Sequence, residues 1–291
     1  MFTSEEMMPI IEQSLQWHFD VAQFWAVATN GKHKSFPRFQ AKYVIKKHFG
    51  LFVQITIAYL LLVLATLLLM RNRKRFKLQY PLMVWNFALS IFSFYGSYVM
   101  LSAMVKTIRA LGLYACACNE FSKMSPAAEH WLFLTVLLKA LEFGNTFFLV
   151  LRKKPLSFLH VYHHVLAFLF LAHVYQTTSS LIRCIVIVNL LFNGFMYAYY
   201  FIRSMKIKLS IKAKALATSV YFVQLSLYSI CFVTIYLANR RYSCDTPKLL
   251  LYTASGICFS YFVLFMFFFA KKYLRDDVLF LYRKLKTMKL D

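Results

Sequence analysis

Three histidines are spaced i, i+3 and i+4 in an apolar stretch of the chain, and they are His160, His163 and His164. On an α-helix these offsets share one face, so the three imidazoles would point at a common spot. A neutral imidazole can act as a general base near pH 7 or as a nucleophile. Because strongly polar groups at membrane depth are costly, a cluster of three indicates a functional site rather than packing.

The composition indicates a polytopic membrane protein. Of the 291 residues, 60% are hydrophobic, and the apolar residues are gathered in long segments. The formal net charge is +23, but the lysines and arginines lie between the apolar segments, where they can orient the chain in a membrane. They could also attract anionic lipid head groups or a polyanionic substrate. We therefore expect membrane lipid as a partner and no nucleic acid.

Seven apolar segments each approach the ~20 residues that cross a bilayer. The predicted fold class is therefore an all-α integral membrane protein with seven transmembrane helices. The segments cover residues 49–70, 81–105, 131–151, 158–175, 181–202, 213–237 and 249–270. We expect one membrane domain at 49–270, preceded by a polar N-terminal extension at 1–48 and followed by a basic tail at 271–291.

The distribution of lysine and arginine predicts how the chain crosses the membrane. Twenty of these residues fall in the loops and tail on one side, and thirteen fall in the segments on the other. This favours a luminal N-terminus and a cytosolic C-terminus. Cys116, Cys118 and Cys244 would then lie in loops of the oxidising compartment, where Cys118 or Cys116 could form a disulfide with Cys244. Three free thiols are the alternative.

Polar side chains recur on one face of three further spans, at a depth close to that of the histidines. The span 131–151 carries a charged stripe, and the spans 181–202 and 213–237 carry amides and phenols. The members are Lys139, Glu142, Asn145, Asn189, Asn193, Tyr197, Tyr200 and Gln224. Such faces should meet inside the bundle, which predicts a buried chamber open to the cytosol. Hydrogen bonds that only hold the helices together are the alternative.

Three motifs in fixed order resemble one family. They are LKALEFGNTF at 138–147, LRKKPLSFLHVYHH at 151–164, and Asn189 followed by MYAYY at 196–200. This set is similar to the ELO family of very-long-chain fatty acid elongases, over about residues 70 to 270. The resemblance implies seven transmembrane helices, six of which form a barrel around a substrate tunnel.

The resemblance also implies an activity and a place in the cell. Members are acyltransferases that condense a long-chain acyl-CoA with malonyl-CoA, release CO2 and give a 3-ketoacyl-CoA. They use no cofactor and no metal, and they lie in the endoplasmic reticulum membrane. Their partners are the other enzymes of the elongation cycle, namely 3-ketoacyl-CoA reductase, 3-hydroxyacyl-CoA dehydratase and enoyl-CoA reductase. A second copy of the chain is a further candidate partner.

Roles follow for the residues of the motifs. We expect His163 to be the nucleophile, with His160 and His164 as orienting groups and oxyanion donors. Lys139 and Glu142 would set the local charge. The basic residues expected to hold the CoA phosphates are Arg152, Lys153, Lys154, Lys206 and Lys208, although each taken singly also fits a role in membrane orientation. The polar residues expected to contact substrate are Asn189, Tyr197, Tyr200 and Gln224.

Two positions depart from the family pattern. Asn145 stands where the pattern usually has aspartate, and Asn193 stands where it usually has a histidine of the active site. An asparagine can donate a hydrogen bond to an oxyanion, but it cannot be acylated or act as a base. A catalytically weakened elongase paralogue is therefore one alternative.

Two other function classes compete. A membrane di-iron desaturase or hydroxylase needs several histidine clusters, and one cluster of three cannot supply two metals. A seven-helix receptor or transporter would also have seven spans, but a receptor has no need of a charged stripe facing three histidines. A transporter could use them as a proton relay.

Overall fold

The computed structural model describes residues 38–118, 125–177, 180–207, 211–241, 244 and 246–270. Within these ranges every regular element is a helix. The helices are α2 (Arg38–Lys47), α3 (Phe49–Met70), α4 (Gln79–Cys118), α5 (Pro126–Glu142), α6 (Gly144–Leu151), α7 (Phe158–Gln176), α8 (Leu181–Ser204), α9 (Ile211–Arg241) and α10 (Lys248–Phe269).

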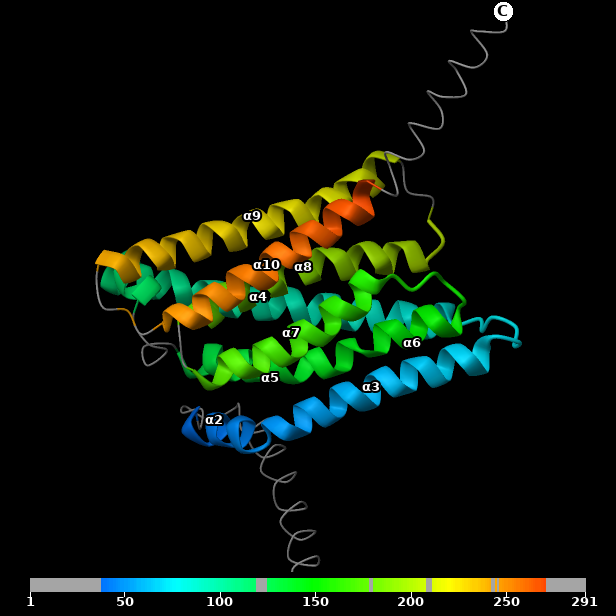
Figure 1. Cartoon of the computed structure of the whole chain (residues 1–291). Helices are drawn as coiled ribbons and strands as arrows, with labels where there is room; N and C mark the ends of the chain where they lie inside the picture. Colours follow the sequence, from blue (N-terminus) through cyan, green and yellow to red (C-terminus); the bar gives the residue numbers. More distant parts are fainter. Residues whose placement is uncertain are drawn as a thin grey trace, which may run out of the picture.

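Seven spans of the described chain are long and apolar enough to cross a membrane, which confirms the predicted fold class. They are α3, α4, the pair α5–α6, α7, α8, α9 and α10, and they run side by side (Figure 1). A helix satisfies its backbone hydrogen bonds internally, which a chain in lipid must do because no water is present there. The long apolar runs of this sequence therefore become helices.

Two spans differ from their predicted shape. The predicted segment 81–105 is part of the longer α4, whose axis breaks at Gly112, where φ is 82°. The predicted segment 131–151 is two helices, because a turn at Phe143 separates α5 from α6. α5 also begins earlier than predicted, at Pro126, behind the cap formed by Ser125. A proline suits the first turn of a helix because its missing N–H is not needed there.

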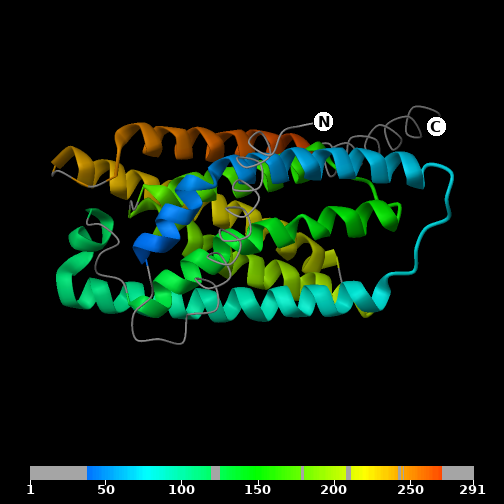
Figure 2. The same cartoon turned by 90° about the horizontal axis from the view of Figure 1, so that it is seen from below.

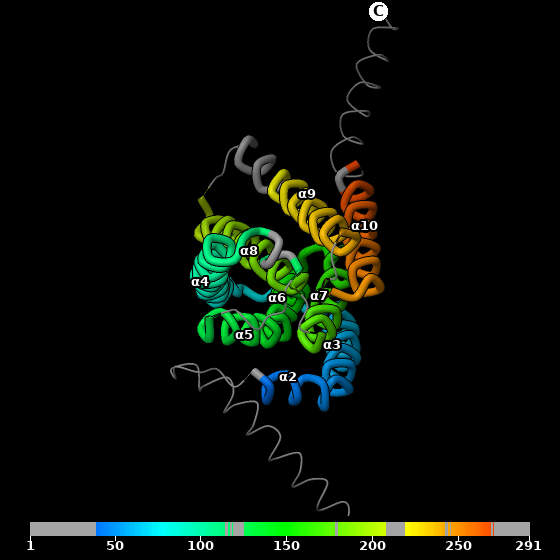
Figure 3. The backbone as a smooth tube through the Cα atoms, turned by 90° about the vertical axis from the view of Figure 1, so that its left-hand side faces the viewer, coloured from blue at the N-terminus to red at the C-terminus, as the bar shows by residue number. Residues whose placement is uncertain are grey.

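Six of the seven spans form a closed ring. Neighbouring members touch in the order α4, α8, α9, α10, α7 and α5, and α5 touches α4 again. α3 lies outside this ring and packs against α6 and α7 (Figure 3). The arrangement is consistent with the six-helix barrel that the resemblance implies.

α2 lies against the outside of the ring, next to the start of α3 (Figures 2 and 3). Ala41, Val44 and Ile45 are buried on its inner face, where α2 meets α3, α5 and α7. The described part of the predicted N-terminal extension is therefore a helix with a buried apolar face. Residues 1–37 and the predicted basic tail 271–291 lie outside the described residues.

A disulfide ties two distant segments at one end of the bundle. It joins Cys118, at the end of α4, to Cys244, between α9 and α10, across a sequence separation of 126. Cys116 is a buried free thiol, and its backbone carbonyl accepts a hydrogen bond from Arg183 Nη2 at 2.7 Å.

Candidate active site

The three histidines lie at the start of α7. Ser157 caps this helix, and its hydroxyl accepts a hydrogen bond from the His160 backbone N–H at 3.3 Å. The ring centroids of His160 and His164 are 4.4 Å apart, and those of His163 and His164 are 5.7 Å apart. The cap therefore starts the helix so that its first turns bring the three imidazoles together.

A hydroxyl between two helices holds His160. Its Nε2 lies 3.0 Å from Thr146 Oγ1 on α6, and the same hydroxyl lies 2.8 Å from the Tyr59 hydroxyl on α3. The Tyr59 ring stacks on Phe143 with centroids 4.0 Å apart. The outer helix α3 thus reaches the histidine cluster through Thr146.

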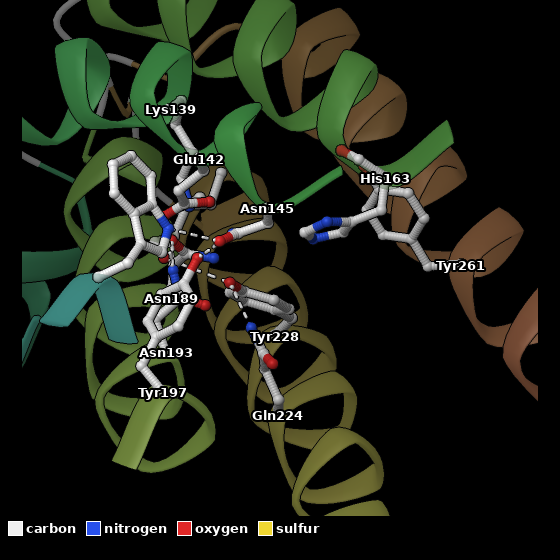
Figure 4. A network of polar contacts seen from close by, with 12 residues as sticks. Lys139, Glu142, Asn145, His163, Asn189, Asn193, Tyr197, Gln224, Tyr228 and Tyr261 are labelled. Carbon is white, nitrogen blue, oxygen red and sulfur yellow. Dashed lines mark hydrogen bonds and ion pairs between the residues drawn. The ribbon is translucent and has the colours of Figure 1, made fainter. Parts of the chain in front are cut away.

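His163 is placed differently. Its ring packs against Tyr261 of α10 with centroids 5.2 Å apart, and the Tyr261 hydroxyl donates to the His163 backbone carbonyl at 3.5 Å. No side chain in the described parts of the chain forms a hydrogen bond with the His163 ring nitrogens. Figure 4 shows this imidazole extending from α7 toward Asn145.

A buried ion pair lies at the end of α5. Lys139 Nζ is 2.9 Å from each carboxylate oxygen of Glu142, and both side chains are at most 4% exposed. Asn193 Nδ2 on α8 donates to Glu142 Oε1 at 3.0 Å and to Asn189 Oδ1 at 3.3 Å. The charge of each partner is thereby balanced at a depth where an unpaired charge would be costly.

Asn145 joins three helices. Its Oδ1 accepts from the Trp85 indole N–H of α4 at 2.7 Å, and its Nδ2 donates to the Tyr197 hydroxyl of α8 at 2.9 Å. Gly144 permits this contact, because a Cβ at that position would lie only 2.8 Å from the Trp85 ring. Protein side chains therefore bind both polar atoms of the Asn145 amide.

These two groups of residues face one another across a cavity of about 1200 Å³. The side chains that line it come from the six spans of the ring and from the connection between α6 and α7, and none of the lining residues belongs to α3. Most of the predicted site residues line it together: His160, His163, His164, Lys139, Glu142, Asn145, Asn189, Asn193, Tyr197, Tyr200, Gln224, Arg152 and Lys154. Gln224 Nε2 also donates to the Tyr228 hydroxyl at 3.2 Å.

Two of the predicted phosphate ligands that the structure describes are not among the cavity-lining residues. Lys153 Nζ donates to the Arg71 backbone carbonyl at 3.2 Å instead. Lys206 is exposed in the turn after α8, and Lys208 lies outside the described residues. Arg203 lines the cavity although it was not predicted as a ligand. It lies on the last turn of α8, 5.8 Å from the Tyr199 ring.

Sequence reasoning also missed Tyr59, Thr146 and Tyr261. Thr146 lies in the motif at 138–147 but was given no role. Tyrosines are ordinary in apolar helices, and Tyr59 belongs to the span outside the ring, so no local signal marked Tyr59 or Tyr261. The contact of Trp85 with Asn145 was not predicted either. In the described part of the chain, no three His, Cys, Asp or Glu side chains converge as metal ligands would.

The fold and the cavity together define a multi-pass membrane protein with a polar site inside a ring of helices. A family model described as ELO, the GNS1/SUR4 family, matches residues 44–278. The chain belongs to this family, which confirms the resemblance found in its motifs.

Curated relatives agree with this assignment. "Long chain fatty acid elongase 1" of Caenorhabditis elegans is 34% identical over 269 residues, which are 91% of this chain and 92% of the relative. "Very long chain fatty acid elongase 3" of Mus musculus is 33% identical, over 76% of this chain and 82% of the relative. "Very long chain fatty acid elongase 6" of Homo sapiens is 29% identical, over 71% and 78%.

Proposed function

We propose that this chain is a fatty acid elongase, and that it catalyses the condensing step. The reaction joins a long-chain acyl-CoA to malonyl-CoA, releases CO2 and gives a 3-ketoacyl-CoA longer by two carbons. Family membership and the names of the relatives support the process. The arrangement of the cavity supports the step.

One observation carries the proposal. The His163 imidazole projects into the cavity without a hydrogen-bond partner among the described side chains, and it faces an ordered polar region (Figure 4). A nucleophile needs a free lone pair, whereas groups that stabilise developing charge must be fixed in advance. The cavity offers both in one place.

The chemistry proceeds in two stages. The neutral His163 imidazole attacks the thioester carbonyl, expels the CoA thiolate and becomes an acyl-imidazole. Malonyl-CoA then loses CO2, and the resulting enolate attacks the acyl carbon. The imidazole leaves as the new carbon–carbon bond forms. It takes up a proton from solvent in place of the ring N–H proton that acylation released, and this regenerates neutral His163. His160 and His164 orient the nucleophile and donate to the oxyanion.

The CoA moiety would bind at the cavity end where Arg152, Lys154 and Arg203 lie. Arginine suits phosphate recognition because its planar guanidinium can donate two parallel hydrogen bonds. This end is the predicted cytosolic side of the endoplasmic reticulum membrane, where both CoA substrates and the enzymes of the later steps would be met. The proposed chemistry uses only protein groups and the two substrates, with no cofactor.

The test uses purified protein in liposomes, labelled malonyl-CoA, and saturated, monounsaturated and polyunsaturated acyl-CoAs. We expect label in 3-ketoacyl-CoA with the wild type and a loss of roughly a thousand-fold or more in His163→Ala. His173→Ala is the matched control, because His173 lies on the same helix, is exposed and packs on Phe49 at 6.2 Å. No label with any acyl-CoA, from folded wild-type protein, would overturn the proposal and favour a non-condensing paralogue.

A further inference from the structure

The orientation of the Asn145 amide is fixed by its neighbour. The Trp85 indole nitrogen can only donate a hydrogen bond, so the atom 2.7 Å from it must be the amide oxygen. Nδ2 therefore faces Tyr197, 2.9 Å away. A flipped amide would place two donors against each other at the Trp85 contact, so the hydrogen bonds themselves determine the orientation.

This orientation determines the direction of the next hydrogen bond. Because Asn145 Nδ2 can only donate, the Tyr197 hydroxyl accepts there and its own proton is left over. Tyr197 is 2% exposed and lines the cavity. Among the described residues no acceptor lies within hydrogen-bond distance of this proton. A buried donor without an acceptor is costly, and such donors commonly mark a place for a ligand.

The neighbouring amide cannot take over this role. Asn193 has two N–H groups, and they go to Glu142 and Asn189. The sequence led us to expect that Asn193 could donate to an oxyanion, but its described contacts leave no N–H for a substrate. The Tyr197 phenol lies beside it on α8 and has a proton to give.

We propose that Tyr197 is a catalytic residue that donates a hydrogen bond to the substrate's carbonyl oxygen as negative charge develops on it. Asn145 Nδ2 already donates to the Tyr197 oxygen, so the Tyr197 O–H is left to donate to a substrate. The inference rests on the proposed condensation, in which both the thioester oxygen and the enolate oxygen become negative. No proton is transferred: the phenol keeps its hydrogen and stabilises the charge through a hydrogen bond whose direction is already fixed.

An aspartate at position 145 would reverse the hydrogen bond. A carboxylate has only acceptor oxygens, so it would take both the Trp85 N–H and the Tyr197 O–H. Asn145→Asp therefore removes the donor from the cavity while it leaves Tyr197 in place and paired. This variant complements Tyr197→Phe, which removes the hydroxyl itself and leaves Asn145 Nδ2 without an acceptor.

Infrared spectroscopy tests the contact without turnover. Palmitoyl-CoA labelled with carbon-13 at its thioester carbonyl would be bound to purified protein at pH 8, using His163→Ala so that no acyl transfer occurs. We expect the carbonyl stretch to fall in frequency on binding, and the shift to disappear when Tyr197→Phe or Asn145→Asp is added. Adding Tyr98→Phe should leave it unchanged, because Tyr98 is 69% exposed on the outer face of α4. A shift that survives either site variant, or is absent from the parent, overturns the proposal.

Kinetic measurements on protein that retains His163 separate this inference from the proposed function. We expect Tyr197→Phe and Asn145→Asp each to lower kcat roughly a hundred-fold, as loss of one oxyanion donor does. The double variant should be no slower than either single variant, because both changes remove the same hydrogen bond. An infrared shift together with wild-type protein that makes no 3-ketoacyl-CoA would refute the proposed condensation and support the hydrogen bond from Tyr197 to the substrate carbonyl. Additive losses of kcat in the double variant would refute the proposed hydrogen bond from Tyr197 and leave the proposed condensation intact.

Discussion

The two sides of the cavity differ in how their polar atoms are engaged. On α5, α6 and α8 the amides and charges of Lys139, Glu142, Asn145 and Asn193 bind one another or Trp85, at distances of 2.7 to 3.0 Å. Of the three histidines on α7, His160 is held by a side-chain hydrogen bond to Thr146, whereas the His163 ring has packing contacts alone in the described chain. The first side is an ordered electrostatic frame, whereas the second carries the imidazole that we propose as the nucleophile.

This difference suggests a division of labour. Groups that stabilise charge act best when they need no reorganisation, so they are fixed by hydrogen bonds. A nucleophile must keep its lone pair available, so it is positioned by packing instead. Variants that loosen the frame should therefore affect stability, and variants near the histidines should affect turnover.

The largest expected effect comes from breaking the buried ion pair. Glu142→Gln leaves the Lys139 charge buried without a carboxylate, which should cost about 3–5 kcal/mol in free energy of unfolding. Thermal unfolding in detergent would measure it. Lys139→Met combined with Glu142→Gln removes both charges and should recover most of that stability. A double variant as unstable as Glu142→Gln alone would show that the pair is not what orders this side.

The next effect concerns the hydroxyl that holds His160. Thr146→Val keeps the side-chain shape but removes the contact with both His160 and Tyr59, and misplaced catalytic groups lose roughly ten- to a hundred-fold in kcat. Steady-state kinetics should show little change in KM. Tyr59→Phe keeps the stacking on Phe143 and should lose less. An equal loss in both variants would indicate that Tyr59, rather than Thr146, is the principal support.

A smaller effect is expected where the frame is packed most tightly. Gly144→Ala would push a Cβ to 2.8 Å from the Trp85 ring, and overpacking of this kind costs about 1–3 kcal/mol. Gly256→Ala is the matched control, because it lies in α10 with nothing within 4 Å of its Cβ position. Gly144→Ala should therefore unfold at a lower temperature than Gly256→Ala. Equal unfolding temperatures would mean that Trp85 can move away from a Cβ at position 144 without loss of stability.

The smallest effect is predicted at the mouth of the cavity. Arg203→Gln should raise the KM for acyl-CoA by roughly three- to ten-fold, since one charge-assisted phosphate contact is lost. The difference from wild type should shrink as salt is added. Arg240→Gln makes the same change at the far end of α9 and should leave KM unaltered. A change in kcat alone for Arg203→Gln would place this residue outside CoA binding.

The sequence predicted the spans and the membership of the cavity because both follow from local patterns. Apolar runs long enough to cross lipid become helices, and polar residues at one depth turn inward, as Lys139, Asn193 and Gln224 do. The motif residues therefore assembled largely as expected.

The particular partners could not be predicted, because they depend on how helices distant in sequence are rotated against each other. Nothing local indicates that Trp85 reaches Asn145, or that Tyr59 outside the ring reaches His160 through Thr146. The position of Lys153 could not be predicted for a related reason. It has a φ of 52° in a tight turn, and its amine binds the Arg71 carbonyl rather than lining the cavity.

The most direct test of the account is to look for the acyl-enzyme itself. Wild-type protein would be incubated with palmitoyl-CoA in the absence of malonyl-CoA, quenched in acid and digested for mass spectrometry. The account predicts release of CoA and a palmitoyl group on the peptide containing His163, discharged when malonyl-CoA is added. An acyl group on a different residue, or condensation with no acylated protein, would contradict the assignment of His163 as nucleophile.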